Sequence, residues 1–175
     1  ALLATVQDKL LQKKLLEGAG IAVADYVETP NPNPESFAEF GYPLVQKARR
    51  GGYDGRGVAV MQEPEEFSRH LPVPSFVERF IVAEKEIAVL VARGKDGESR
   101  CYPVVEMRFR PGENMLDMLI APADLSNETS QAAQALAVRT VEALGGVGIF
   151  GIEMFLTHDS KLLVNEVAPR THNSG

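Results

Sequence analysis

The segment 148–173 (GIFGIEMFLTHDSKLLVNEVAPRTHN) constrains the fold most, because it predicts two apolar strands joined by a short turn. If Asp159 and Ser160 form a two-residue loop, Glu153 lies directly opposite Glu166 on one face of the hairpin. Carboxylates so placed, with Cβ atoms roughly 4.5–5.5 Å apart, repel unless a proton or a cation lies between them. With no His or Cys at ligand spacing, these oxygens favour Mg²⁺, which proteins bind through one or two carboxylates and substrate phosphates. The hairpin therefore predicts a magnesium site for nucleotide chemistry.

The composition is that of an ordinary globular protein and argues against two kinds of partner. The chain has 175 residues, of which 45% are hydrophobic and 24% are charged, so it is long enough to bury a core. Its net charge of −6 and pI near 5.1 argue against nucleic-acid and membrane surfaces, because these attract basic patches. Cys101 is the only cysteine, so we expect no internal disulfide and a reducing, cytoplasmic compartment.

The ends of the sequence and its hydropathy suggest a piece of a larger protein. The chain begins at Ala1 rather than Met, and it ends at Gly175 within a motif that looks unfinished. No signal peptide and no apolar run of membrane-spanning length is visible. We therefore expect a fragment of a longer protein.

Hydrophobic periodicity and turn residues predict an α+β protein. Apolar residues recur at helical spacing over 8–17, and Asn127 can cap a long helix that reaches residue 143. Apolar runs bounded by Gly, Pro or Asn predict a short helix at 63–70 and strands at 21–27, 42–48, 58–61, 75–80, 84–92, 100–107 and 115–121. We expect two lobes, a smaller one at 1–76 and a larger one at 77–175.

A glycine-rich segment at 51–57 (GGYDGRG) lies between two predicted strands. Glycines let backbone N–H groups approach phosphate oxygens, although no Walker-type Gly-Lys-Ser/Thr follows and no helix begins there. Four cations lie in or beside the segment, namely Lys47, Arg49, Arg50 and Arg56. In an acidic protein this arrangement favours a phosphate clamp that closes over its ligand as a lid. The alternatives are a flexible hairpin tip for the loop and a solvated edge residue for Lys47.

Two further segments could contact a nucleotide or a small anion. Residues 77–81 (VERFI) join the predicted lobes, and an extended connector can offer backbone groups to an adenine edge. An ordinary strand fits the same pattern equally well. Arg170, His172 and Asn173 lie just beyond the second metal-bearing strand, in a cluster suited to a small oxyanion.

Five segments, in their order and spacing, closely resemble the ATP-grasp core of the 5-(carboxyamino)imidazole ribonucleotide synthase family: KARRGGYDGRG, VERFIVAEKEIAVLVAR, YPVVEM, VGIFGIEMF and LLVNEVAPRTHNSG. The resemblance covers nearly the whole chain. It implies two α+β lobes with nucleotide bound between them, flanked by an N-terminal and a C-terminal domain outside this chain. The implied activity, in de novo purine synthesis, carboxylates 5-aminoimidazole ribonucleotide with ATP and bicarbonate through carboxyphosphate. Mg²⁺ is the implied cofactor, and a homodimer is possible for the full-length protein.

The resemblance also implies roles for individual residues. The implied metal ligands are Glu153 and Glu166. The implied ATP contacts are Lys9, Lys47, Gly52, Gly55, Glu78, Arg79, Phe80, Ile81, Glu86, Asn165 and Glu166, with the lysines on phosphates, 78–81 on adenine and Glu86 on ribose. The implied substrate contacts are Tyr53, Asp54, Arg170 and Asn173, and the implied catalytic residues are Asp54, Arg170 and His172. Arg170 and His172 would hold bicarbonate or carboxyphosphate.

Three positions depart from the family pattern. Met107 and Phe109 stand where the family usually has Asn and a nucleotide-contacting His, and Thr171 replaces a usual Pro. Neighbouring Arg108 or Arg110 could supply phosphate contacts instead. Two other functions fit the pattern: an ATP-grasp ligase for a different acid and amine, and a nucleotide-binding module that keeps the fold without turnover.

Overall fold

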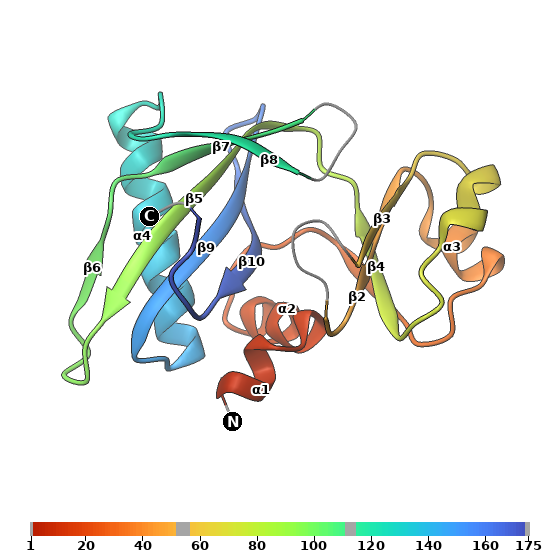
Figure 1. Cartoon of the computed structure of the whole chain (residues 1–175), viewed down its shortest axis with the longest axis horizontal. Helices are drawn as coiled ribbons and strands as arrows, with labels where there is room; N and C mark the ends of the chain where they lie inside the picture. The colour runs from red at the N-terminus through yellow and green to blue at the C-terminus, as the bar shows by residue number, and fades with distance from the viewer. Residues whose placement is uncertain (1, 52–56, 111–114, 174–175) are drawn as a thin grey trace.

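The computed structural model describes residues 2–51, 57–110 and 115–173, and these form an α+β fold (Figure 1). The strands are β1 (Tyr26–Thr29), β2 (Leu44–Ala48), β3 (Val58–Met61), β4 (Ser75–Arg79), β5 (Ala83–Arg93), β6 (Ser99–Cys101), β7 (Val105–Phe109), β8 (Leu116–Ile120), β9 (Gly148–Thr157) and β10 (Leu162–Ala168). The helices are α1 (Leu2–Val6), α2 (Lys9–Gly18), α3 (Pro34–Phe40), α4 (Asn127–Leu144) and the 3₁₀ helix η1 (Pro64–Arg69).

The strands form two sheets with antiparallel pairing. The smaller sheet has the order β1-β4-β2-β3, and the larger sheet has the order β10-β9-β5-β7-β8 with β6 paired to β5. Figure 1 shows the smaller sheet at one end of the long axis, α4 against the larger sheet, and α2 between the two sheets. No helix in the described part of the chain is long and apolar enough to cross a membrane.

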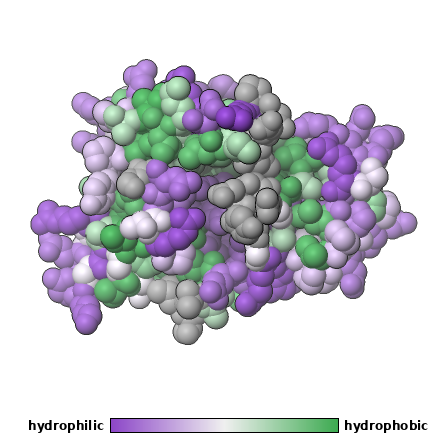
Figure 2. Space-filling model, viewed as in Figure 1, coloured by the Kyte–Doolittle hydropathy of each residue, from purple (hydrophilic) through white to green (hydrophobic). Residues whose placement is uncertain are grey.

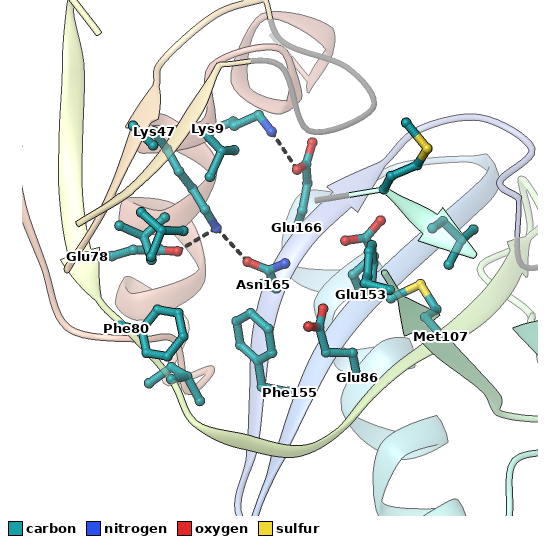
Figure 3. Close-up of a pocket in the computed structure, with 18 of the residues that line it drawn as sticks. Lys9, Lys47, Glu78, Phe80, Glu86, Met107, Glu153, Phe155, Asn165 and Glu166 are labelled. Atoms are coloured by element: carbon teal, nitrogen blue, oxygen red, sulfur yellow. Dashed lines mark hydrogen bonds and ion pairs between the residues drawn. The ribbon is translucent and has the colours of Figure 1, made fainter. Parts of the chain in front are cut away.

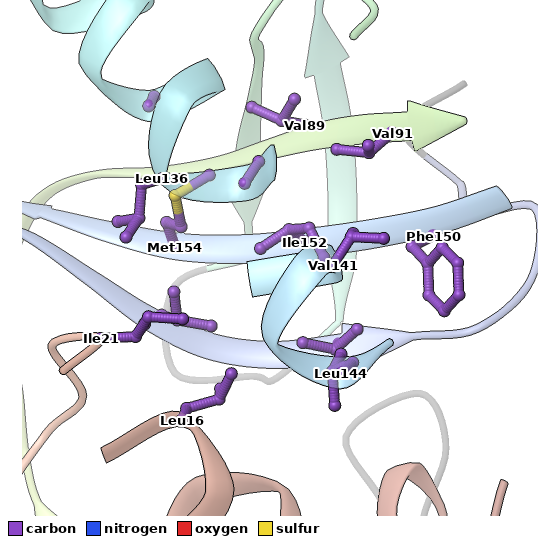
Figure 4. Close-up of a cluster of buried hydrophobic side chains, with 14 of the residues drawn as sticks. Leu16, Ile21, Val89, Val91, Leu136, Val141, Leu144, Phe150, Ile152 and Met154 are labelled. Atoms are coloured by element: carbon purple, nitrogen blue, oxygen red, sulfur yellow. The ribbon is translucent and has the colours of Figure 1, made fainter. Parts of the chain in front are cut away.

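The larger sheet carries the main hydrophobic core on the face that α4 covers (Figure 4). Alternate residues of β5 and β9 point into it, including Val89, Val91 and Ile152, and Val141 of α4 packs against them. The smaller sheet has a separate core of four buried side chains, Phe37, Leu44, Met61 and Val77. The opposite face of the larger sheet is therefore left for the site.

Polar side chains begin the helices next to these cores. Asp8 accepts hydrogen bonds from the backbone N–H groups of Leu10 and Leu11, which caps α2. The long predicted helix is present, but Ser126 caps it through the backbone N–H of Thr129, so the prediction of Asn127 as the cap is wrong by one residue. Gly145 ends α4 in a left-handed conformation with φ of 65°.

The predicted elements differ from the structure in three places within the first 41 residues, the first of which is helix α1, which was not expected. The strand expected at 21–27 begins only at Tyr26, because the residues before it run along the edge of the larger sheet, where the Val164 N–H donates to the Ala22 carbonyl. Helix α3 was not expected. Asn33 caps it through the backbone N–H of Ser36, and Pro34 occupies its first turn, which is a favoured place for proline.

The expected division into lobes at residue 76 remains a prediction, and two packing features bear on it. The boundary falls inside β4, all of which pairs with strands of the smaller sheet. Leu16 of α2 and Ile21 lie in the expected smaller lobe, yet they pack in the core of the larger sheet. Helix α2 therefore belongs to the larger sheet by packing and reaches the smaller sheet through polar contacts.

Candidate active site

A cleft of about 1170 Å³ lies between the two sheets. Strands β2, β3 and β4 supply one wall, β5, β7, β9 and β10 supply the other, and Lys9 of α2 also lines it. Figure 3 shows charged side chains from both walls pointing toward one another. Figure 2 shows apolar residues over β7 and β8 beside more hydrophilic ones nearer the centre of the same face. The cleft thus combines a polar part with an apolar part.

The hairpin of β9 and β10 places the two predicted metal ligands opposite each other, with Glu166 paired to Glu153 in the ladder. The predicted pair is confirmed, but the predicted two-residue loop is wrong. The Thr157 N–H donates to the Lys161 carbonyl, so residues 158–160 form a three-residue loop, and its last residue has a left-handed φ of 61°.

A β-bulge restores the pairing that the longer loop would have shifted. The register changes by one residue between Val164 and Glu166, so Asn165 is the extra residue of the bulged strand. Val164 and Val167 both point into the core, whereas Asn165 and Glu166 both line the cleft. Two neighbouring polar side chains therefore reach the site from one strand, which strict alternation would forbid.

Each acid of the hairpin has a nitrogen partner. Lys9 Nζ lies 2.5 Å from Glu166 Oε2, and His172 Nε2 lies 2.9 Å from Glu153 Oε1. The described residues include no group of three or more His, Cys, Asp or Glu side chains that could hold a metal ion. A complete protein cage is therefore not present among them. Two opposed carboxylates fit Mg²⁺, which takes its remaining ligands from phosphate oxygens and water.

The second charged cluster is buried and centres on Glu78 of β4. Lys47 Nζ from β2 lies 2.5 Å from Glu78 Oε1, and Lys13 Nζ from α2 lies 2.7 Å from Glu78 Oε2. Lys47 also donates to Asn165 Oδ1 at 2.6 Å, which links this cluster to the metal-bearing hairpin (Figure 3). The cluster therefore connects α2, both sheets and the cleft.

Burial and neighbouring charge act against each other in this cluster. Burial alone would raise the pKa of Glu78, but Lys47 and Lys13 hold that pKa below its usual range. Burial alone would lower the pKa of Lys47, but Glu78 and the two more distant acids of the hairpin raise it. Burial, joined by repulsion from Lys47, holds the pKa of Lys13 below its ordinary value, against the attraction of Glu78. Glu78 and Lys47 are therefore kept charged by each other.

Glu86 of β5 faces the cleft from the larger sheet. Burial and then the charge of Glu153 raise the pKa of Glu86 to about 7, against the opposing influence of Lys47. Its expected contact with a ribose remains a prediction.

The apolar part of the cleft is lined mainly by residues from the connector and the larger sheet. Phe80 and Ile81 follow β4, and Phe155 approaches from β9 (Figure 3). Met107 and Phe109 of β7 extend the apolar surface. A flat aromatic base would find nonpolar surface here, beside the backbone of the connector.

Three arginines named in the sequence hypotheses point elsewhere. The Arg79 guanidinium lies 4.8 Å from the centre of the Phe40 ring and donates to the Phe40 carbonyl, while the Arg79 N–H donates to the Asp25 carbonyl, so the structure gives no support to its expected nucleotide contact. Arg108 pairs with Glu106, and Arg110 pairs with an acid of β8. Neither of these two lines the cleft, so the structure gives no support to their expected phosphate contacts.

Arg170, His172 and Asn173 all line the cleft just beyond β10. Arg170 is exposed and donates to the next carbonyl of the chain at 2.8 Å. His172 is buried against β9, where a Cβ at Gly151 would lie 2.6 Å from the Cβ of His172. The glycine therefore lets the imidazole approach closely enough to contact Glu153.

Sequence reasoning missed two polar residues of α2. Gln12 and Lys13 are both buried, and Gln12 both donates to the carbonyl and accepts from the N–H of Val167 in β10. The signal was a pair of polar residues inside a leucine-rich helix, three and four residues after Lys9, which begins the helix.

Four predicted contacts, Gly52, Tyr53, Asp54 and Gly55, lie outside the described residues, as does most of the predicted lid.

A family model described as the ATP-grasp domain matches residues 14–175. Phosphoribosylaminoimidazole carboxylase of Schizosaccharomyces pombe is 40% identical over 182 aligned residues, covering 100% of this chain and 33% of that protein. N5-carboxyaminoimidazole ribonucleotide synthase of Mycobacterium tuberculosis is 40% identical over 177 residues, covering 97% of this chain and 41% of that protein. The chain thus spans well under half the length of these curated relatives.

Solved structures give the same result. N5-carboxyaminoimidazole ribonucleotide synthetase of Thermotoga maritima has a TM-score of 0.86 and 44% identity, covering 99% of this chain and 44% of its own. The Aspergillus clavatus synthase, solved with ADP and 5-aminoimidazole ribonucleotide, has a TM-score of 0.89 and 33% identity, covering 99% of this chain and 46% of its own.

Proposed function

Because the chain belongs to the ATP-grasp family, we propose that its cleft binds MgATP and that the full-length protein carboxylates 5-aminoimidazole ribonucleotide with bicarbonate. The observation that carries the proposal is the opposed pair of Glu153 and Glu166, with Lys9 and Lys47 beside it in a cleft that has an apolar end. This is the charge pattern that phosphoryl transfer requires. The bound ADP and imidazole ribonucleotide in the Aspergillus clavatus relative support the choice of substrates.

The first proposed step activates bicarbonate, which is a poor electrophile. A bicarbonate oxygen attacks the γ-phosphorus of ATP, the bond from that phosphorus to the β–γ bridging oxygen breaks, and ADP leaves carboxyphosphate behind. Lys9 and Lys47 would neutralise charge on the phosphate oxygens. Glu153 and Glu166 would hold Mg²⁺, which when bound supplies Lewis-acid neutralisation of the phosphate charge.

The second proposed step transfers the carboxyl group. The amine nitrogen of the imidazole ribonucleotide attacks the carboxyl carbon, the bond from that carbon to the phosphate oxygen breaks, and the nitrogen loses a proton as phosphate leaves. Arg170 and His172 would hold the carboxyphosphate oxygens, for which a planar guanidinium is well shaped. Asp54 would orient the amine.

The test is ADP release by the full-length protein with MgATP, with bicarbonate and 5-aminoimidazole ribonucleotide added singly and together. We expect fast release only when both are present. Release that needs a different acid or amine would identify another ligase, and nucleotide binding without release would identify a non-catalytic module. The cytoplasmic location and the homodimer are separate predictions, which cell fractionation and light scattering would test.

A further inference from the structure

Lys13 is a buried cation that the proposed chemistry does not use. Only 4% of its side chain is exposed. The other buried residues of α2 are Leu10, Gln12 and Leu16, none of which carries a charge. It is not among the side chains that line the cleft. Burying an ammonium group is costly unless the group is paired, so the position of Lys13 points to a specific use of its charge.

Lys13 contacts Glu78, which lines the cleft. The two oxygens of this carboxylate contact different lysines, Lys13 at 2.7 Å and Lys47 at 2.5 Å. Two ammonium groups and one carboxylate leave one net positive charge in the cluster. Lys47 is the one cation of these three residues that lines the cleft. The net positive charge of the cluster therefore faces the cleft at Lys47.

Removal of Lys13 would change that balance. Glu78 would then neutralise Lys47 completely, and the cluster would offer no net charge to an anion. We propose that Lys13 is a positioning residue that neutralises Glu78 and thereby keeps the Lys47 ammonium available to the phosphates of a bound nucleotide. This inference rests on the proposed function, because it assumes that the cleft binds a nucleotide.

A purely structural role predicts a different result. If Lys13 only supported β4 and the connector, its loss would weaken every nucleoside ligand alike, because adenosine and ATP share the same base and ribose. If Lys13 acts through the charge of Lys47, the loss should grow with the number of phosphates. The ratio of ATP affinity to adenosine affinity therefore separates the two roles.

The experiment measures the affinities of adenosine, AMP, ADP and ATP, with Mg²⁺ present, by calorimetry on the full-length protein. Lys13→Met should lower ATP affinity about tenfold and adenosine affinity less than about twofold. The double variant Lys13→Met with Glu78→Gln removes one charge of each sign, so its ATP-to-adenosine ratio should return to within about threefold of the wild type. Lys14→Met is the matched control, because Lys14 is the next residue, is half exposed and pairs with Glu28 at the surface.

Equal losses for all four ligands, or no loss in Lys13→Met, would overturn the proposal, as would a double variant that stays as weak for ATP as the single one. If Lys13→Met does not fold, Glu78→Gln is compared with the double variant. The proposal then expects an ATP-to-adenosine ratio about tenfold higher in Glu78→Gln, and equal ratios would refute it. Failure of the proposed nucleotide binding is distinguishable, because the wild-type protein would then bind none of the four ligands. Failure of the proposed carboxylation would show in the ADP-release test instead and would leave these affinities unchanged.

Discussion

Two lysine contacts to glutamate at the cleft differ sharply in burial. In the pair of Lys9 and Glu166 the side chains are 17% and 36% exposed, whereas in the pair of Lys47 and Glu78 they are 9% and 3% exposed. Water and salt weaken the first pair, and exposed pairs contribute only about 0–1 kcal/mol. Loss of Glu78 would leave the buried Lys13 and Lys47 ammonium groups without the carboxylate that they share.

The difference separates an exchangeable contact from a fixed one. Under the proposed function, Glu166 would exchange Lys9 for Mg²⁺, and Lys9 would exchange Glu166 for phosphate. Both exchanges need little energy because both side chains already reach solvent. The cluster around Glu78 would stay assembled throughout, because each of its charges depends on the others.

The largest expected effect breaks the fixed cluster. Glu78→Ala should lower the free energy of unfolding by about 3–5 kcal/mol, because it leaves Lys13 and Lys47 buried together without their shared carboxylate. Glu166→Ala is the matched control and should cost less than about 1 kcal/mol. Urea denaturation of the full-length protein measures both. Equal costs would show that burial does not distinguish the two contacts.

The next effect concerns chemistry rather than stability. Glu153→Gln and Glu166→Gln should each lower ADP release by about a hundredfold or more, since each removes a proposed Mg²⁺ ligand, while the thermal midpoint stays close to that of the wild type. Steady-state assays over a range of Mg²⁺ concentrations would show whether excess metal restores part of the rate. Near-normal turnover at ordinary Mg²⁺ in either variant would remove these acids from the metal site.

The smallest effect tests Glu86, which is partly buried in the wall of the cleft. Its folded pKa of about 7 lies above the ordinary value of 4.5, so the folded state binds the extra proton between these pH values. The stability from this proton is complete below about pH 4.5 and is lost as pH rises through about 7. Glu86→Gln should therefore stabilise the ligand-free protein by about 1–3 kcal/mol at pH 8 and change little at pH 5. Denaturation curves at the two pH values would show the difference, and a stabilisation that is the same at both would contradict it.

The parts of the site that lie within one hairpin could be predicted from sequence, because the residue pattern of a hairpin determines which of its residues face each other. The pairing of Glu153 with Glu166 was predicted from a loop one residue too short, and the bulge at Asn165 compensated for the error. The bulge had a visible signal, because Val164 and Val167 are three residues apart and flank two polar residues, a spacing that alternation does not give.

Other features depend on contacts that no local pattern contains. Lys13 follows Lys9 by four residues on a helix, which by itself indicates a solvated face. Its burial depends on Glu78, which lies far along the chain and in the other sheet. The resemblance to a known family predicted the fold and the cleft, but the direction of the Arg79 side chain required the position of Phe40 in a helix that was not expected.

The contact of Gln12 with β10 has a consequence for self-association. Strand β10 is an edge of the larger sheet, and an exposed edge can recruit a strand from another molecule. The Gln12 amide pairs with both the N–H and the carbonyl of Val167, much as a neighbouring strand would, and the Val164 N–H is taken by the Ala22 carbonyl. The strand that carries Glu166 is thereby protected against edge-to-edge aggregation along the stretch that the site needs.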